Sequence, residues 1–499
     1  MDYIKVFKRA HKWIMDNTIE EKGIVINSAE KKVYPEVTGY YIPTLLKWGE
    51  KERAKSFASY LCSIQKMDGS WYDAYDNDAY VFDSAQILKG LLAIRDMFPD
   101  VDVNIRRGCD WLISNITEEG RLVTPCRDAW GNDDNFCSEL IHLYCLTPLI
   151  EAGKVTGKDI YIELAEKALN YYKKNHHDKI VNFSLLSHFY AYVMEGLLDL
   201  GEYDLVAEAM NNIKKYKVSR GMIPAQNNVK WVCSTGLFQL ALVWYKMGEL
   251  EEGNRQFEQA CRLQNSTGGW YGGYPSSVIA QCLSRKQRPF YFPDAEISWA
   301  NKYFLDALYE KCHLEFEKQA DAFLEYIDKK DERYITILNI INEQKAEKVL
   351  DAGCGKGRYL KNLREDVADV KFYGMDLSEK VMQSLPDEIE KIQGTLTSIP
   401  FEDETFDVVY SCEAVEHAIN VEAAISELIR ITKKGGVVVV IDKSADKLGQ
   451  MEIEDWEQWL ADDEMGRFVE KQRCRLEINK DIGYDDKRDG LFHAWVIYK

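Results

Sequence analysis

Apolar residues recur at intervals of three and four along most of residues 1–312, a spacing that places them on one face of a helix. One such stretch contains Ile87, Leu88, Leu91, Leu92 and Ile94. Turns interrupt the helical pattern roughly every 45–60 residues, which is the length of a helical-hairpin repeat. The turns lie at 176–178 and around Gly23, Gly69, Gly120, Gly221 and Gly268. The pattern predicts a first region that is almost wholly helical and built from repeated hairpins.

Two of these hairpins are related in sequence. The segments that begin at Gly49 and Gly248 align without a gap, and each has the pattern of a polar-faced helix, a tight glycine turn and an aromatic cover. The identical pairs are Cys62/Cys261, Gln65/Gln264, Gly69/Gly268, Trp71/Trp270 and Tyr72/Tyr271. Six turns imply six hairpins, which close naturally into a ring. We therefore predict an all-α (α/α)6 toroid over residues 1–312, with a funnel at one end.

The pattern changes after a charged helical connector at 313–345. Short apolar strands then alternate with helices, an arrangement typical of a parallel sheet covered on both faces. The expected strands are 348–351, 371–376, 407–411 and 436–442, followed by two more at about 472–479 and 491–498. A polar stretch separates the last two, which indicates an antiparallel hairpin at the sheet edge. Residues 346–499 are thus expected to form an α/β Rossmann-like domain with a seven-stranded, mostly parallel sheet.

The strongest motif is VLDAGCGKGRYLKNL at 349–363, where an apolar strand ends at Asp351 and a glycine-rich turn leads into a helix. Gly353, Gly355 and Gly357 allow a ligand to approach the backbone closely, and the helix N-terminus offers free N–H groups. A second strand ends at Asp376, 25 residues after Asp351. A carboxylate at this position can accept hydrogen bonds from both hydroxyls of a ribose.

With the segment 392–443, these motifs occur in an order and spacing that resemble the class I S-adenosylmethionine-dependent methyltransferases over residues 346–499. The resemblance implies that S-adenosylmethionine is the cofactor. It assigns Asp351, Gly353 and Gly355 to the amino acid part of the cofactor, Asp376 to the ribose and Leu377 to the adenine. The complete expected cofactor-binding set is Asp351, Gly353, Cys354, Gly355, Asp376, Leu377, Thr395, Leu396 and Cys412. Thr395 is a departure, because the family usually has an aspartate there that contacts the adenine amino group.

His417 is the candidate catalytic residue. It follows the fourth strand in the run Glu413-Ala-Val-Glu416-His417, at the expected edge of the cofactor. Methyl transfer needs alignment of nucleophile, methyl and sulfur, and a base only where the nucleophile must lose a proton. A histidine titrates near neutral pH and can serve as that base. The alternative is structural, with Glu416 and His417 capping the next helix and orienting its loop.

The Gln-x5-Trp endings of the two related hairpins resemble the QW motifs of terpene cyclase and prenyltransferase toroids. The acid and metal motifs of those activities are missing, since neither Asp-x-Asp-Asp nor Asp-x-Cys occurs in the chain. Acidic and aromatic residues instead suggest a funnel that binds a small molecule, sugar or glycan acceptor. The candidate substrate-binding residues are Asp83, Asp134, His188, Trp231 and Glu296. The toroid is alternatively a glycan hydrolase or lyase, a terpenoid-type enzyme or a non-catalytic partner-binding module.

Composition narrows the partners. The formal net charge of -19 argues against nucleic acid, because phosphate backbones would repel the chain. No Cys-x-x-Cys pair occurs among the 12 cysteines, so we expect neither a zinc site nor a bound metal. No apolar run reaches the roughly 18 residues that span a bilayer, and the N-terminus has no signal-peptide pattern. We therefore expect a soluble, cytoplasmic methyltransferase.

Overall fold

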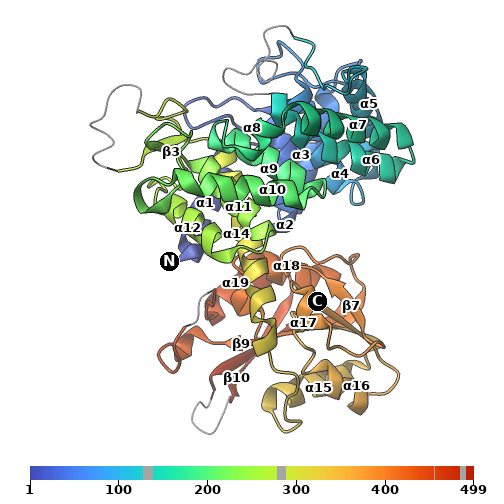
Figure 1. Cartoon of the computed structure of the whole chain (residues 1–499). Coiled ribbons are helices and arrows are strands. Elements are labelled where there is room, and N and C mark those ends of the chain that lie inside the picture. Colours follow the sequence, from blue (N-terminus) through green and yellow to red (C-terminus); the bar gives the residue numbers. More distant parts are fainter. Residues whose placement is uncertain (127–138, 278–287, 454–455, 484–489) are drawn as a thin grey trace. The chain divides into compact units, whose positions relative to one another are not determined.

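The computed structural model describes residues 1–126, 139–277, 288–453, 456–483 and 490–499. It divides into two compact units. The N-terminal unit comprises residues 1–46 and 51–314, and the C-terminal unit comprises residues 47–50 and 315–499. In Figure 1 the colour runs from blue to yellow through the N-terminal unit and on to red in the C-terminal unit.

Helices dominate the described part of the N-terminal unit, and they fall into two kinds. Five bury most of their residues: α2 (Pro35–Lys47), α4 (Val81–Ile94), α9 (Ser187–Asp199), α11 (Ser234–Lys246) and α14 (Ser298–Gln319). A sixth, α6 (Leu146–Thr156), buries five of its 11 residues and continues directly from a 3-10 segment that is wholly buried. Six others bury only one face: α1 (Tyr3–Asp16), α3 (Lys51–Ile64), α5 (Asp102–Ser114), α7 (Asp159–Asn175), α10 (Tyr203–Ile213) and α12 (Leu250–Cys261). An amphipathic helix covers a core, whereas a helix that is apolar all round lies inside it.

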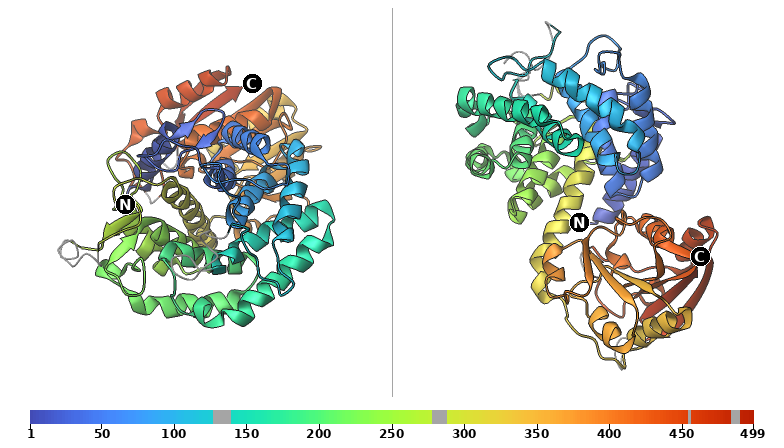
Figure 2. Two further views of the ribbon diagram at one scale, coloured as in Figure 1. Left: turned by 90° about the horizontal axis from the view of Figure 1, so that it is seen from above. Right: turned by 90° about the vertical axis from the view of Figure 1, so that its right-hand side faces the viewer.

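The buried helices contact one another in sequence order, with the 3-10 segment Glu139–Cys145 preceding α6. The last of them, α14, returns to the first, since the Thr44 hydroxyl of α2 donates to Asp306 at 2.7 Å. The contacts between successive helices are Gly39 with Ile87, Phe82 with Tyr144, Tyr144 with Tyr192, His188 with Gln239 and Phe238 with Phe304. Seen from above, the helices follow a circuit from blue through green (Figure 2, left).

The two hairpins that are related in sequence are built alike. The Gln65 side-chain amide donates to the carbonyls of Gly69 and Asn104, both at 2.9 Å. In the second copy, the Gln264 amide donates to the carbonyls of Gly268 and Val6, both at 3.0 Å. The indoles repeat as well, and their N–H groups donate at 2.8 Å: Trp71 to Leu61 and Trp270 to Ala260. The repeat is therefore structural, because equivalent side chains fix the same turn to another amphipathic helix, α5 in the first copy and α1 in the second.

Short elements complete the described part of the N-terminal unit: helix α8 (His177–Val181) and the antiparallel pairs β1 (Thr18–Ile19) with β2 (Gly23–Ile24) and β3 (Trp231–Cys233) with β4 (Gly273–Pro275). The expected end of this region at residue 312 falls inside α14, which continues to Gln319. The connector then forms a 3-10 turn at Ala320–Ala322 and reaches α15 (Glu332–Gln344).

The C-terminal unit has a seven-stranded sheet in the order β10-β11-β9-β8-β5-β6-β7. Its strands are β5 (Lys348–Ala352), β6 (Lys371–Asp376), β7 (Glu390–Gln393), β8 (Phe406–Cys412), β9 (Thr432–Lys443), β10 (Arg475–Ile482) and β11 (Phe492–Tyr498). The pairs from β7 to β9 are parallel, and β10 and β11 add an antiparallel edge. The prediction of a Rossmann-like, mostly parallel sheet of seven strands is confirmed.

Apolar residues fill both faces of this sheet. The helices are α15, α16 (Leu360–Asp366), α17 (Glu379–Met382), α18 (Val421–Ile431) and α19 (Asp462–Lys471). One core gathers β5, β8 and β9 residues with α15 and α16, and the other gathers alternate residues of the same strands with α18 and α19. Strands buried on both faces place their carboxyl ends, and the loops that follow them, at one edge. Among the described residues, no helix combines the length and apolar character that crossing a membrane would require.

Candidate functional site

The glycine-rich loop leaves β5 at the carboxyl edge of the sheet. Gly353, Gly355 and Gly357 have φ angles of +86°, +52° and +74°, which L-residues with a side chain rarely adopt. A Cβ atom on Gly353 would lie 2.3 Å from the Cβ of Ala414 in the loop after β8. The loop is therefore a cradle whose backbone only glycine can supply at this position.

Asp376, at the end of β6, organises this loop. One carboxylate oxygen accepts the backbone N–H of Gly355 at 2.8 Å, and the other accepts that of Ser378 at 3.0 Å. Burial raises the pKa of Asp376, while these N–H groups lower it in part. Each oxygen keeps acceptor capacity, because a carboxylate has about four lone-pair sites. The geometry suits recognition of a diol beside the loop.

Asp351 and Cys412 lie deeper than Asp376. Asp351 is 1% exposed, and its carboxylate accepts the Tyr410 hydroxyl at 3.0 Å. Burial raises the pKa of Asp351 to about 8. Cys412 ends β8 with its Sγ atom 3.1 Å from the Tyr359 hydroxyl, and burial raises the pKa of this thiol and of Cys354. Both thiols are thus packing groups at neutral pH rather than nucleophiles.

The other expected cofactor contacts follow β6 and β7. The Leu377 carbonyl accepts the Gln393 side-chain amide at 3.3 Å, and the Gly394 N–H donates to the carbonyl of Asp376 at 3.0 Å. Thr395 and Leu396 come next, and the Thr395 hydroxyl lies 3.1 Å from that of Thr397. The loop after β7 is thus held beside Asp376, in the region the sequence predicts for the adenine.

His417 lies in a 3-10 turn, Val415–His417, after β8. Burial, with Lys443 nearby, lowers the pKa of His417 to about 4. Its ring contacts Phe316 edge-on at a centroid distance of 5.7 Å. Glu416 is 1% exposed and forms an ion pair with Lys443 at 2.7 Å, and burial raises its pKa to about 7. At neutral pH the His417 ring is therefore uncharged: it can accept a hydrogen bond or a proton, and a pKa this low makes it a weak base.

A group of charges that the sequence did not reveal surrounds the same edge. Glu413, directly after β8, forms ion pairs with Arg333 of α15 and with Arg358, the latter at 2.6 Å. Arg333 also pairs with Asp331 at 2.7 Å. Sequence spacing gives no signal for this group, because the three elements meet only in the folded sheet. The two guanidinium groups hold the loop that carries His417.

Two of the candidate residues of the N-terminal unit lie at or beside one cavity. A cavity of about 380 Å³ is lined by His188 and by aromatic and acidic side chains, including Glu36. Asp83, in the first turn of α4, is buried beside it, and burial followed by Asp73 raises the pKa of Asp83 to about 8. Glu36 was not predicted, since its position in the first turn of a helix reads as a solvated residue.

The structure places Trp231 and Glu296 elsewhere. Trp231 is fully buried with its ring against Phe290, and the Glu296 carboxylate accepts the indole N–H of Trp13 at 2.7 Å. Neither residue lines this cavity. Asp134 lies outside the described residues.

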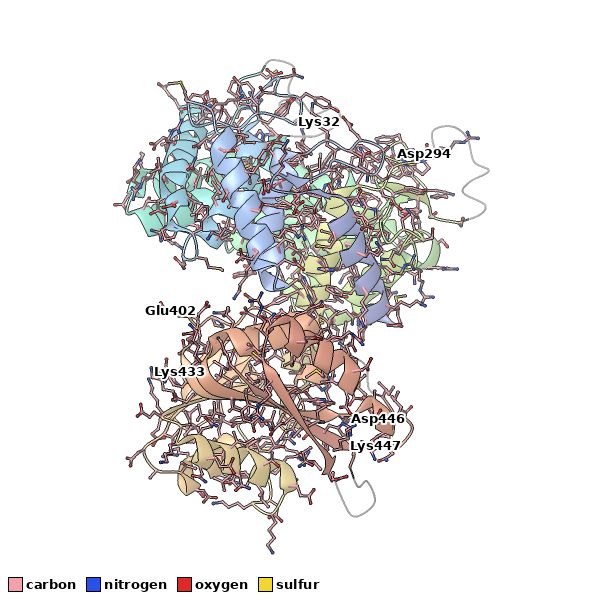
Figure 3. All side chains as sticks on the ribbon, turned by 180° about the vertical axis from the view of Figure 1, so that it is seen from behind. Lys32, Asp294, Glu402, Lys433, Asp446 and Lys447 are labelled. Carbon is pink, nitrogen blue, oxygen red and sulfur yellow. The ribbon has the colours of Figure 1, made fainter. Side chains whose placement is uncertain are left out.

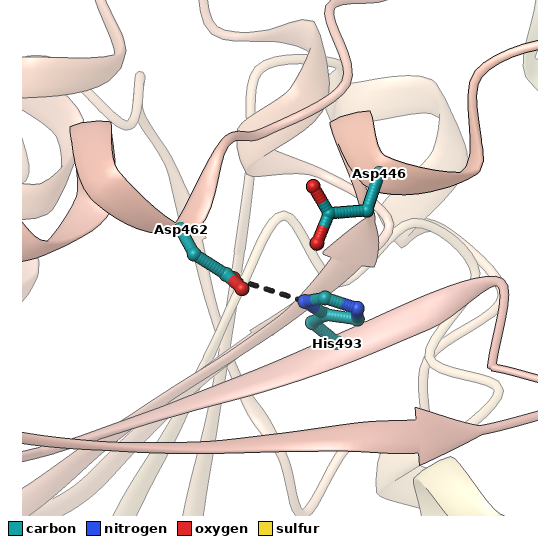
Figure 4. Close-up of side chains that lie close together, drawn as sticks. All are labelled: Asp446, Asp462 and His493. Atoms are coloured by element: carbon teal, nitrogen blue, oxygen red, sulfur yellow. Dashed lines mark hydrogen bonds and ion pairs between the residues drawn. The ribbon is translucent and has the colours of Figure 1, made fainter.

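One group within the described ranges has metal-ligating spacing. Single ligand atoms of Asp446, Asp462 and His493 lie within 4.8 Å of one another (Figure 4), and Figure 3 shows Asp446 beside Lys447. Asp462 already accepts the His493 Nδ1–H at 2.9 Å and forms an ion pair with Lys480 at 2.6 Å. The Lys480 ammonium already pairs with the carboxylate that a metal ion would need. We therefore assign this group a structural role, which is to anchor α19 on the sheet edge.

Comparisons with known proteins agree with this geometry. The family described as "Methyltransferase domain" matches residues 350–440, from β5 to β9. A sterol 24-C-methyltransferase of Gibberella zeae is 33% identical over 146 residues, which cover 26% of this chain and 33% of the relative. A malonyl-[acyl-carrier protein] O-methyltransferase of Erwinia billingiae is 33% identical over 111 residues, which cover 22% of this chain and 43% of the relative.

A solved S-adenosylmethionine-dependent methyltransferase from Archaeoglobus fulgidus is 14% identical and has a TM-score of 0.29; the match covers 33% of this chain and 94% of that one. By the match of residues 350–440, the C-terminal unit carries a methyltransferase domain. The chain spans less than half the length of the two relatives it matches here.

Proposed function

We propose that the protein is an S-adenosylmethionine-dependent methyltransferase whose C-terminal unit binds the cofactor and whose N-terminal unit binds a small-molecule, sugar or glycan acceptor. The observation that carries the proposal is the pairing of Asp376 with the loop around Gly355. The carboxylate that we propose to accept the ribose hydroxyls is hydrogen-bonded there to the glycine loop. The match of residues 350–440 to a methyltransferase domain supports the same assignment.

The N-terminal unit is proposed to be an (α/α)6 toroid. The return contact from α14 to α2 and the repeated Gln–Gly–Trp turns support a closed ring. The acceptor role rests on the cavity, whose aromatic faces suit sugar rings and whose carboxyl groups suit hydroxyls. A volume of about 380 Å³ is in the range of small-molecule sites.

In the proposed reaction, S-adenosylmethionine supplies a methyl group already activated on a sulfonium. The Gly353–Gly357 backbone and Asp376 would bind and orient it. His417, neutral at pH 7 and held at the end of β8, would accept a proton from the acceptor. Positioning would contribute more to the rate than the base, because alignment of the reacting groups lowers the activation barrier without a covalent intermediate.

His417→Gln tests this role. We expect methyl transfer to fall about 100-fold, the scale of general-base catalysis, with the affinity for S-adenosylmethionine unchanged. Single-turnover kinetics and calorimetry measure the two effects. If His417 only orients its loop, the polar glutamine should restore most of the activity that His417→Ala loses. That result would contradict the base assignment.

A methyl-transfer screen tests the function as a whole. The purified full chain is incubated with S-adenosylmethionine carrying a labelled methyl group and a panel of monosaccharides, amino sugars and oligosaccharides, with Asp376→Ala as the blank. We expect label in at least one acceptor, and strongly reduced label with Asp376→Ala when the cofactor is below saturation. If calorimetry detects binding of neither S-adenosylmethionine nor its demethylated product, the proposal is overturned.

A further inference from the structure

The cavity of the N-terminal unit has aromatic walls. Six of the side chains that line it are Tyr34, Tyr40, Phe82, Tyr192, Tyr291 and Trp299. The Phe82 ring contacts Tyr192, the Tyr291 ring contacts Trp299, and His188 lies against Tyr192 at a centroid distance of 4.4 Å. Aromatic faces carry negative electrostatic potential, so a cavity walled by them attracts positive charge.

Glu36 brings a carboxylate to this cavity without a partner. It lies in the first turn of α2, is 5% exposed and lines the cavity. No hydrogen bond or ion pair of the described residues involves its side chain, whereas the other lining acids are engaged: Glu30 accepts the Tyr75 hydroxyl and Asp73 accepts backbone N–H groups. Burial, and then Asp83, raise the pKa of Glu36 well above its usual value. The carboxyl group thus has no cation of the described residues in direct contact, and a buried charge is stable only when it is paired.

Cations are missing from the cavity wall as the structure describes it. None of the lining side chains is lysine or arginine. The nearby Lys302 is 4% exposed and engaged with Asp306 at 2.8 Å, although it lowers the pKa of Glu36 in part. The Lys32 ammonium lies over the ring of the lining residue Tyr75, 4.1 Å from its centre. An anionic ligand would therefore find no lysine or arginine among the described side chains that line this wall.

His188 adds an acceptor rather than a charge. Its Nδ1 lies 3.0 Å from the Gln239 side-chain oxygen, and the Gln239 amide donates to Glu195 at 2.8 Å. This chain makes Nδ1 the protonated nitrogen and leaves Nε2 as an acceptor, which no hydrogen bond of the described residues uses. Burial lowers the pKa of His188 to about 3, so the ring stays neutral and does not repel a cation.

We propose that this cavity binds a protonated amine on a small ring-bearing molecule, with the ammonium group paired to Glu36 and the ring held between the aromatic walls. An amino sugar has this chemistry. The inference rests on the proposed function in one respect: it names the class of acceptor that the N-terminal unit would hold. The ion pair would also supply the partner that the buried carboxylate lacks.

Calorimetry with matched probe pairs tests the proposal at pH 7 on the full chain. Glucosamine is compared with N-acetylglucosamine, which lacks the charge, and benzylamine with benzyl alcohol. We expect at least one amine to bind about tenfold or more tightly than its uncharged counterpart. Glu36→Gln, which keeps the shape of the side chain, should remove that preference. Asp96→Asn, at a side chain that is 97% exposed, is the matched control and should leave it unchanged.

Equal affinity of amine and neutral probe, absence of binding by both amines, or an amine preference that survives Glu36→Gln would each overturn the proposal. Circular dichroism of Glu36→Gln verifies that the variant folds, and the comparison of amine and neutral probes on the natural chain tests the proposal without any substitution. Asp376→Ala should bind the amine as the natural chain does. A failure of the proposed cofactor site and a failure of the proposed amine site would therefore give different results.

Discussion

Replacing Asp376 by alanine should weaken the binding of S-adenosylmethionine by about 100-fold. The change removes the oxygen that holds the Gly355 N–H at 2.8 Å and the one that holds the Ser378 N–H at 3.0 Å. It also removes the acceptor proposed for the ribose hydroxyls. Hydrogen bonds to a charged group contribute about 1.5–3 kcal/mol each, and about 3 kcal/mol corresponds to roughly 100-fold in affinity. Titration calorimetry with S-adenosylmethionine and with its demethylated product measures the loss.

Asp387→Ala is the matched control for this experiment. Asp387 is fully exposed in the same unit, and its carboxylate lies 3.7 Å from the Lys391 ammonium. Exposed ion pairs contribute about 0–1 kcal/mol, so this variant should bind the cofactor normally. If the affinity of Asp376→Ala for S-adenosylmethionine stays within a few-fold of that of the natural chain, Asp376 does not bind the ribose. That result would leave the methyltransferase assignment of the domain unchanged.

Local motifs explain why the C-terminal unit was largely predictable. Strands β5, β6, β8 and β9 are apolar runs, which the sequence displays directly. The sequence pattern does not predict strand β7 (Glu390–Gln393), because this strand has no buried residue and pairs on one side only. The glycine loop and Asp376 were identified because their chemistry lies within a short stretch. Their roles in binding stay predictions until a ligand is measured.

The sequence revealed less wherever tertiary packing decides a residue's role. Glu36 reads as an acid in the first turn of a helix, and only the closing of α2 against α4 buries it at a cavity. Trp231 and Glu296 are residue types expected to line a funnel, yet the Trp231 ring packs against Phe290 and the Glu296 carboxylate accepts a hydrogen bond from Trp13. Periodicity gives the buried face of a helix, but it does not tell which end of a loop faces the cavity. Sites assembled from several hairpins therefore need the folded structure.

Substitutions in the repeated glycine turns should have a large effect on the stability of the protein, because these turns contact neighbouring helices where no side chain fits. Gly69 has a φ of +98°, and a Cβ atom there would lie 2.2 Å from the carbonyl oxygen of Arg107. Gly268 has a φ of +102°, and its Cβ would lie 2.1 Å from the carbonyl oxygen of Arg9. Both contacts are with backbone, which cannot move aside as a flexible side chain can.

Gly69→Ala and Gly268→Ala should each destabilise the protein by about 3–4 kcal/mol, combining backbone strain with a clash inside a packed turn. Urea unfolding followed by circular dichroism at the helical band measures this as a lower transition midpoint. Gly248→Ala is the control, since Gly248 has a φ of +79° but no atom within 4 Å of the added Cβ, so only about 1 kcal/mol of strain is expected. If all three variants lost the same stability, the turn contacts would not hold the repeats together. A much larger loss at Gly69 and Gly268 would show that the two related hairpins are fixed to their neighbours by the same close backbone contact.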